Sequence, residues 1–341
     1  MITLSVIVSA SVLVYCSAAI YQQPLREIKS MRLKQLEAGT GTEKWAKWRR
    51  NATQPLRDYY DISYVSDVTV GTPPQTLSVI LDTGSSDFWV PGSDCINCVG
   101  QWKEFRRSAS STYQRLDRSF KINYGSGSVY GSLAQDRFCF GRTGLCYGKQ
   151  VFGEAVMVPK IRYLGFDGIC GMAFQAESAF NEPSPYRNIR DSLDKPYFTF
   201  WMQHRGGSGE VGGLVTFGGF DAQHCSSDIH WVSLTRAAFY QYNIDSISAG
   251  NFVNNRRRRV ISDTGSSHLF GPPALVDRLA MELGGRYDPE TRAAGPYRCY
   301  LAVAPIYVRG IDWILGDTFI RAVCNVFDPV KKRIGFAKAK L

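Results

Sequence analysis

Short apolar runs alternate with polar residues along most of the chain. The runs are rich in β-branched and aromatic residues, with glycine and asparagine between them. Alternation at every second residue, bounded by turn residues, indicates half-buried β-strands. The pattern therefore predicts a mostly β protein, with strands within residues 62–70, 120–124, 129–133, 151–158, 214–217 and 242–247. The clearest helical pattern covers residues 273–283, with a proline near its start and two glycines after its end.

The first nineteen residues carry no charged side chain and end in the small residues Ser17, Ala18 and Ala19. This pattern predicts a secretory signal peptide over residues 1–19. Because the segment lacks a basic start, an uncleaved signal anchor is the alternative interpretation. No later stretch reaches the roughly eighteen apolar residues that a membrane span needs. We therefore expect no membrane span after the signal.

The composition suits a folded protein of two lobes. The 341 residues are 44% hydrophobic and 21% charged, which excludes disordered and fibrous classes. The net charge of +10 would suggest a nucleic-acid partner, but residues 20–50 alone carry eight basic and three acidic side chains. Half of the excess charge thus lies in a leader segment, so we expect no nucleic-acid partner. A basic quartet at residues 256–259 is interpreted as a solvated hairpin tip, with a processing site or polyanion patch as alternatives.

Nine cysteines are present, and loss of Cys16 with the signal would leave an even eight. In an exported chain this number predicts disulfides, and short spacing favours Cys95–Cys98 and Cys139–Cys146. The Cys-x-x-Cys spacing also occurs in zinc and thiol redox sites. However, this chain has neither a second such pair nor a helix directly after the first. The sequence leaves open the pairing of Cys170, Cys225, Cys299 and Cys324.

Two elements of the sequence occur twice and in the same order. Asp-Thr-Gly-Ser-Ser stands at residues 82–86 and again at residues 263–267, each time after an apolar run. A second element, with two apolar residues before a glycine, follows at residues 166–171 and again at residues 312–317. The repetition predicts two similar lobes that arose by duplication.

Each repeated aspartate follows a strand and precedes a glycine and serine hydroxyls that can stabilise a buried carboxylate. If the two lobes pack about a pseudo-twofold axis, Asp82 and Asp263 face each other. Two carboxylates at about 3 Å share one proton, because both cannot ionise so close together. One can then deprotonate a water molecule while the other protonates a carbonyl oxygen.

With these motifs, residues from about 54 to 339 resemble the pepsin-like aspartic proteases. The resemblance implies a bilobal fold, with two duplicated β lobes around a central substrate cleft. It places the lobes at residues 51–204 and 205–341, after a basic prosegment at residues 20–50. It further implies a monomeric, acid-active endopeptidase of the secretory pathway, either secreted or in an acidic lysosome-like or vacuole-like compartment. Its substrates would be polypeptides, and it would need no cofactor or metal; a non-catalytic peptide-binding homologue is the competing interpretation.

The resemblance also assigns roles to individual residues. Asp82 and Asp263 would form the catalytic dyad, and Tyr124 in a flap over the substrate would hydrogen-bond Trp89. The remaining assignments are support of the dyad by Thr83, Gly84, Ser85, Thr264, Gly265 and Ser266, a flap tip at Gly125, Ser126 and Gly127, and cleft walls from Ile80, Trp89, Phe239 and Tyr240. In the precursor, the prosegment would inhibit the enzyme by covering the cleft, with the dyad neutralised by Lys44, Lys47, Arg49 or Arg50.

The repeat also exposes a difference in length between the lobes. Asp82 and Ile169 are 87 residues apart, whereas Asp263 and Ile314 are only 51 apart, which leaves the second lobe 36 residues shorter. The shortfall is expected near residues 286–298. Relatives in the family have strands there, together with a cysteine that would pair with one placed like Cys299. We therefore expect this chain to be poorly stable and weakly active, and a longer transcript to encode about 36 more residues at this point.

Overall fold

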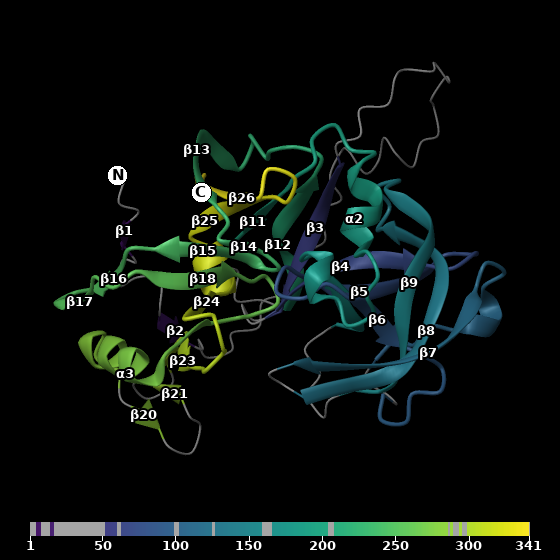
Figure 1. The fold of residues 1–341 in the computed structure, drawn as a ribbon, viewed down its shortest axis with the longest axis horizontal. Coiled ribbons are helices and arrows are strands. Elements are labelled where there is room, and N and C mark those ends of the chain that lie inside the picture. Colours follow the sequence, from purple (N-terminus) through teal and green to yellow (C-terminus); the bar gives the residue numbers. More distant parts are fainter. Residues whose placement is uncertain are drawn as a thin grey trace, which may run out of the picture.

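The computed structural model describes residues 5–7, 14–16, 52–59, 63–98, 102–124, 127–158, 166–203, 208–285, 287–288, 293–294 and 299–340. Strands dominate these residues, and the helices are short. Figure 1 shows two β-rich halves side by side, one with strands coloured blue to teal and the other with strands coloured green to yellow. The fold is mostly β and bilobal, which confirms the predicted fold class.

The strands of the first lobe follow the predicted alternation. In the strands of residues 63–70 and 75–82, Val68 and Val79 are fully buried while their neighbours Thr69 and Ser78 are partly exposed. The second of these strands is buried on both faces in its last four residues, which lead into Asp82. The strands are β4 (Ser63–Val70), β5 (Gln75–Asp82), β6 (Phe88–Pro91), β7 (Gln114–Tyr124), β8 (Gly127–Phe140), β9 (Cys146–Met157) and β10 (Gly168–Gly171).

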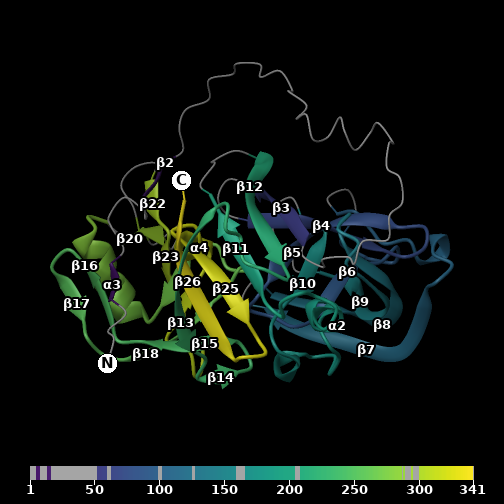
Figure 2. The ribbon, with the colours of Figure 1, turned by 90° about the horizontal axis from the view of Figure 1, so that it is seen from above.

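One thirteen-stranded sheet runs from the first lobe into the second, in the order β13-β26-β25-β11-β12-β3-β4-β5-β10-β6-β9-β8-β7. Strand β3 (Ala52–Tyr59) lies at the junction, where it pairs with β4 and β12. Figure 2 shows β11 and β25 between the two halves. The strands of this sheet that lie beyond β3, on the side of β12, are β11 (Phe198–Met202), β12 (Ser208–Phe217), β13 (Cys225–Ser233), β25 (Val323–Asp328) and β26 (Arg333–Ala339).

A six-stranded sheet in the order β14-β15-β18-β24-β19-β23 forms the centre of the second lobe. Helix α3 (Pro273–Glu282) lies beside it and buries Val276, Leu279 and Ala280, so the predicted helix is confirmed to within one residue. The elements of this lobe are β14 (Arg236–Ala237), β15 (Tyr240–Ile244), β18 (Arg258–Ser262), β19 (Leu269–Gly271), β23 (Val303–Pro305), β24 (Trp313–Leu315) and α4 (Asp317–Ile320).

Smaller elements complete the described residues. Strand β1 (Ser5–Ile7) pairs with β16 (Ser246–Ala249), which also pairs with β17 (Phe252–Asn254). The others are the strand pairs β2 (Val14–Cys16) with β22 (Cys299–Leu301) and β20 (Tyr287–Asp288) with β21 (Ala293–Ala294), helix α2 (Pro185–Arg190), and 3-10 turns at Arg107–Ala109 and Gln175–Glu177. In the described part of the chain, no helix is long and apolar enough to cross a membrane.

Several predictions concern residues outside the described set. These are the remainder of the signal at 1–19, the prosegment at 20–50, the flap residues Gly125 and Ser126, and residues 286, 289–292 and 295–298. They stay predictions, as does the division of the chain at residue 204.

The duplication is visible in the strand pairing of each lobe. In the first lobe, β10 runs parallel to β5 and antiparallel to β6. In the second, β24 runs parallel to β18 and antiparallel to β19. The second sequence repeat therefore lies directly beside the strand that carries the aspartate, and Gly171 stands opposite Asp82 in the register.

The glycine that ends each of these repeats has a steric reason. A Cβ atom on Gly171 would lie 2.4 Å from the backbone of Ser86 and Asp87. A Cβ atom on the equivalent Gly316 would lie 2.1 Å from the carbonyl oxygen of Ser266. The aspartate turns pack so tightly on the neighbouring strand that only glycine fits there.

The structure contains the disulfides Cys95–Cys98 and Cys139–Cys146 that the short spacing favours. It adds Cys225–Cys324, which links β13 to β25 across 99 residues. Cys170 is a buried free thiol in β10.

The basic quartet at residues 256–259 is not at a hairpin tip, and that expectation was wrong. Strand β17 pairs with β16, whereas β18 pairs with β15 and β24, so the quartet connects two sheets. Arg256 and Arg257 are exposed, while Arg258 and Arg259 begin β18 and approach Asp312 at 3.9 and 3.6 Å.

Candidate active site

The two Asp-Thr-Gly turns meet where the lobes join. Asp82 is the last residue of β5, and Asp263 directly follows β18. Each turn is hydrogen-bonded to the end of the parallel strand beside it. Met172 N–H donates to the carbonyl of Asp82 at 2.7 Å, and Asp263 N–H donates to the carbonyl of Leu315 at 3.0 Å. Strand pairing thus fixes the backbone from which each carboxylate projects.

Two threonines tie the turns together across the lobe boundary. The backbone N–H of Thr83 donates to Thr264 Oγ1, and that of Thr264 donates to Thr83 Oγ1, both at 3.0 Å. The Thr83 hydroxyl donates to the carbonyl of Ser262 at 2.9 Å, and the Thr264 hydroxyl donates to the carbonyl of Leu81. Both threonines are buried, so none of these four hydrogen bonds competes with bulk water.

Each carboxylate accepts the same two local hydrogen bonds. Gly84 N–H and the Ser85 hydroxyl donate to the two oxygens of Asp82. Gly265 N–H donates to Asp263 Oδ1 at 2.9 Å, and the Ser266 hydroxyl donates to Oδ2 at 2.7 Å. Matching donors on both sides give the two carboxylates equivalent orientations.

The carboxylates face each other across the two glycines. A Cβ atom on Gly84 would lie 2.5 Å from Asp263 Oδ1, and one on Gly265 would lie 2.3 Å from Asp82 Oδ1. Asp82 and Asp263 are 6% and 7% exposed. Burial, and then the charge of Asp263, raise the pKa of Asp82, which outweighs the opposite effect of the Ser85 hydrogen bond. The arrangement therefore favours the protonated form of Asp82 up to a higher pH than an exposed aspartate would.

One wall beside Asp82 is aromatic. The indole N–H of Trp89 donates to the hydroxyl of Tyr124 at 2.9 Å, as the resemblance implies. Burial raises the pKa of Tyr124, so this phenol is neutral and available as a hydrogen-bond donor. Gly127, in the predicted flap tip, has a φ of 134°, a conformation that favours glycine.

Ile80, two residues before Asp82, belongs to a buried apolar cluster. Ile80 packs with Val65 and Phe166, and Trp102 packs against this group, with its ring 5.3 Å from that of Phe166. The sequence prediction missed Phe166 and Trp102. Phe166 is the first residue of the first copy of the second repeated element, residues 166–171, and that position was the available signal.

Tyr240, predicted on a cleft wall, is buried at the junction of the lobes, and its place on the wall stays a prediction. It is 1% exposed, its ring packs against Phe174, Phe198 and Phe327, and its hydroxyl lies 3.4 Å from the carbonyl of Met172. Aromatic residues of β15 fill the junction between the lobes, because the thirteen-stranded sheet covers them. Its neighbour Phe239 is half-buried.

Two of the described histidines have surroundings of their own. His224 contacts Asp221 at 2.8 Å and stacks on Trp201, and burial lowers the pKa of His268. Among the described residues, no group of three or more histidine, cysteine, aspartate or glutamate side chains is arranged to hold a metal ion.

Known proteins are similar to this chain over most of its length. The eukaryotic aspartyl protease family matches residues 63–297 and 287–339. Aspartic protease 17 of Caenorhabditis elegans is 32% identical over 378 positions, covering 95% of this chain and 96% of the relative. Cathepsin E of Cavia porcellus is 32% identical, covering 94% and 95%. A probable vacuolar protease A of Arthroderma benhamiae is 33% identical, covering 84% and 80%.

The paired turns, their parallel supporting strands and these similarities agree with one another. The chain belongs to the pepsin-like, eukaryotic aspartyl protease family.

Proposed function

We propose that this chain is an acid-active endopeptidase whose catalytic residues are Asp82 and Asp263. The observation that carries the proposal is the pair of glycines, Gly84 and Gly265, each of which leaves room for the opposite carboxylate. Such spacing brings two acids close enough to share one proton, and burial raises the pKa of Asp82.

In the proposed reaction, a water molecule lies between the two carboxyl groups. The ionised carboxylate removes a proton from the water as its oxygen attacks the carbonyl carbon of the peptide bond. The protonated carboxyl group donates its proton to the carbonyl oxygen, giving a neutral tetrahedral diol. Cleavage of the C–N bond then re-forms the carbonyl group as one diol hydroxyl returns its proton to the ionised carboxylate, and the amine leaves with the proton that the other carboxyl group took from the water. The threonine, serine and glycine hydrogen bonds hold both acids in position throughout.

The substrates proposed are polypeptides with apolar side chains beside the cleaved bond. Support comes from the buried apolar cluster of Ile80 with Phe166 and Trp102, which begins two residues before Asp82, and from the Tyr124–Trp89 pair. Desolvation of the cleaved bond in such surroundings strengthens hydrogen bonds to the developing charge.

We further propose that the enzyme is made as a secreted or vacuolar-type precursor. Three disulfides in the described residues suit the secretory pathway. The basic segment at residues 20–50 would cover the acidic dyad and leave when the carboxylates protonate.

Acid proteolysis tests the proposal. The full chain is incubated at pH 3–6 with denatured haemoglobin, with and without pepstatin, beside Asp82→Ala and Asp263→Ala variants. We expect cleavage by the parent chain that pepstatin blocks and that both variants lack. Folded parent chain that binds peptides without cleaving them would favour the non-catalytic alternative.

A further inference from the structure

The flap strand β7 carries a bulge, and the bulge directs an arginine toward another loop. Arg115 pairs with Ala134 on β8, and Ser119 pairs with Ser132, so residues 116–118 stand opposite Leu133 alone. An insertion of this kind re-aims the side chains of the bulged strand. Arg118 is the last residue of the bulge and lies six residues before Tyr124.

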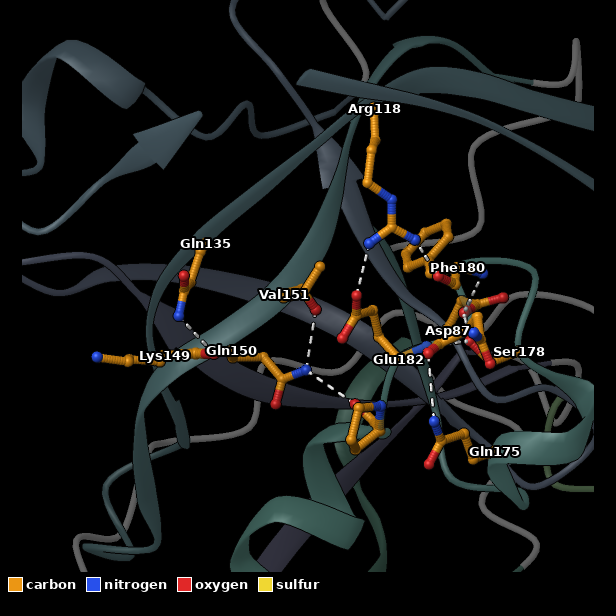
Figure 3. Close-up of polar contacts among 12 residues, drawn as sticks. Asp87, Arg118, Gln135, Lys149, Gln150, Val151, Gln175, Ser178, Phe180 and Glu182 are labelled. Atoms are coloured by element: carbon orange, nitrogen blue, oxygen red, sulfur yellow. Dashed lines mark hydrogen bonds and ion pairs between the residues drawn. The ribbon is translucent and has the colours of Figure 1, made fainter. Parts of the chain in front are cut away.

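Arg118 uses both ends of its guanidinium group on the loop of residues 178–182. One nitrogen lies 2.6 Å from Glu182 Oε1, and the other donates to the carbonyl oxygen of Phe180. Figure 3 shows Arg118 extending toward Glu182 and Phe180, with Asp87 and Ser178 beyond them. The planar, two-point contact fixes direction as well as distance.

The same loop is anchored on its other side to the catalytic turn. Asp87, five residues after Asp82, is 4% exposed and accepts hydrogen bonds from the Ser178 hydroxyl at 2.6 Å and Ala179 N–H at 2.7 Å. Phe180 N–H approaches the same carboxylate at 3.3 Å. Three donors from consecutive residues hold the loop as one body with the segment that follows Asp82.

An apolar contact runs beside the polar one. The rings of Phe120 on β7 and Phe180 on the loop lie 4.9 Å apart in an edge-to-face arrangement. A Cβ atom on Gly153 would lie 2.6 Å from the Phe120 ring, so glycine in β9 makes room for this pair. Both rings belong to the buried cluster that includes Trp89, against which Tyr124 packs.

We propose that Arg118 is a positioning residue that fixes the stem of the flap relative to the catalytic turn. It joins β7 to the loop of residues 178–182, and Asp87 joins that loop to the turn of Asp82. The inference rests on the proposed function, because it assigns the flap a role over substrate. Loss of Arg118 would let the stem shift, so Tyr124 would meet Trp89 and the substrate less often.

The contact is suited to positioning rather than to stability. The side chains of Arg118 and Glu182 are 47% and 28% exposed. Ion pairs this accessible to water contribute little to folding. A change at Arg118 should therefore alter the flap far more than the unfolding transition.

The test compares Arg118→Gln with Arg115→Gln, another exposed arginine of the same strand that leaves the loop contacts intact. Hydrogen exchange is followed in peptides covering residues 119–124 and 127–132, and KM and kcat are measured on a haemoglobin-derived peptide. We expect Arg118→Gln to exchange at least fivefold faster in these peptides and to raise KM about fivefold, with kcat within twofold. Arg118→Lys, which can reach one acceptor, should recover part of both effects.

Hydrogen exchange separates the two proposals, since it needs no activity. If the parent chain fails to cleave, the proposed function fails, and the exchange comparison still decides the role of Arg118. Exchange and KM of Arg118→Gln equal to those of Arg115→Gln would overturn the inference. A fall in the unfolding midpoint with unchanged KM would also overturn it, because that is the result of a purely structural contact.

Discussion

Thr83 and Thr264 each donate a backbone N–H to the other's hydroxyl oxygen at 3.0 Å, although they are 181 residues apart in sequence. Each hydroxyl in turn donates to a backbone carbonyl of the opposite lobe. The four hydrogen bonds join the lobes at the point where the two carboxylates lie. The geometry of the site therefore depends on the contact between the lobes.

Replacing Thr83 with valine should destabilise this contact without changing its shape. The Thr264 N–H and the carbonyl of Ser262 would stay buried without their partner, at a cost on the order of 2 kcal/mol or more. Thr83→Ser keeps the hydroxyl and should cost about 1 kcal/mol, the loss of one buried methyl group. Denaturant unfolding of both variants measures the difference. Equal stabilities for the two variants would contradict a role for the hydroxyl.

Gly84→Ala should inactivate the site sterically. Its Cβ would lie 2.5 Å from Asp263 Oδ1, so the two carboxylates would be pushed out of alignment. A misplacement near 1 Å costs about 100-fold in rate, and we expect kcat/KM to fall at least that far. Gly148→Ala is the control, because nothing lies within 4 Å of the Cβ it would add. The prediction fails if both variants keep the parent activity.

The raised pKa of Asp82 should appear in the pH dependence of stability. A carboxyl group whose pKa is raised on folding binds its proton more tightly in the folded state. The contribution of Asp82 to the free energy of unfolding is thus full below the pKa of the unfolded state, near 4. It is lost as the pH rises toward the pKa of the folded state. The loss is about 1.4 kcal/mol for each unit by which the pKa is raised.

Asp82→Asn cannot ionise and should not show this loss. We expect the variant to gain stability relative to the parent as pH rises from 4 to 7, while losing activity at every pH. Urea unfolding at several pH values measures the free energy of unfolding of the parent and of the variant. Burial also raises the pKa values of Asp87 and Asp167, but these two residues contribute equally to the pH dependence of both proteins. Parallel curves would contradict the raised pKa of Asp82.

Local patterns predicted the site better than they predicted its surroundings. The duplicated motifs implied facing aspartates, because a repeated strand and turn related by a pseudo-twofold axis must meet at that axis. Tyr240 shows the limit of such an argument. Its aromatic strand pattern is the same for a cleft wall and for a lobe junction, and only the pairing of distant strands distinguishes them. The loop contact of Arg118 was equally hidden, since a bulge has no reliable sequence signal.

The disulfides show the same difference between local and distant pairing, and they lead to a further prediction. The short disulfides follow from proximity, whereas Cys225–Cys324 spans 99 residues and could not be inferred from spacing. Closing a loop of that length stabilises by up to about 4.7 kcal/mol in the chain-entropy estimate. We expect the double variant Cys225→Ala, Cys324→Ala to lose about two to three times as much stability as Cys95→Ala, Cys98→Ala, as measured by calorimetry. Similar losses would argue against the entropic origin.

The length difference between the lobes leads to the last prediction. The family matches the chain in two segments that both include residues 287–297, and the alignment with Aspartic protease 17 has more positions than this chain has residues. Relatives therefore have residues that this chain lacks, and the overlap supports a gap near residues 286–298. About 36 residues would supply several strands, at five to six residues each.

Absent strands would leave apolar surface of the second lobe in water, and a net stability of about 5–15 kcal/mol offers little reserve against that loss. We predict that the chain as written unfolds at low denaturant concentration and is weakly active. A version with the corresponding 36 or so residues of a relative inserted near residue 290 should unfold cooperatively and cleave faster. Sequencing transcripts across the codons for residues 286–298 tests whether a longer form exists. Cooperative unfolding and full acid activation of the chain as written would show that the second lobe is complete without those residues.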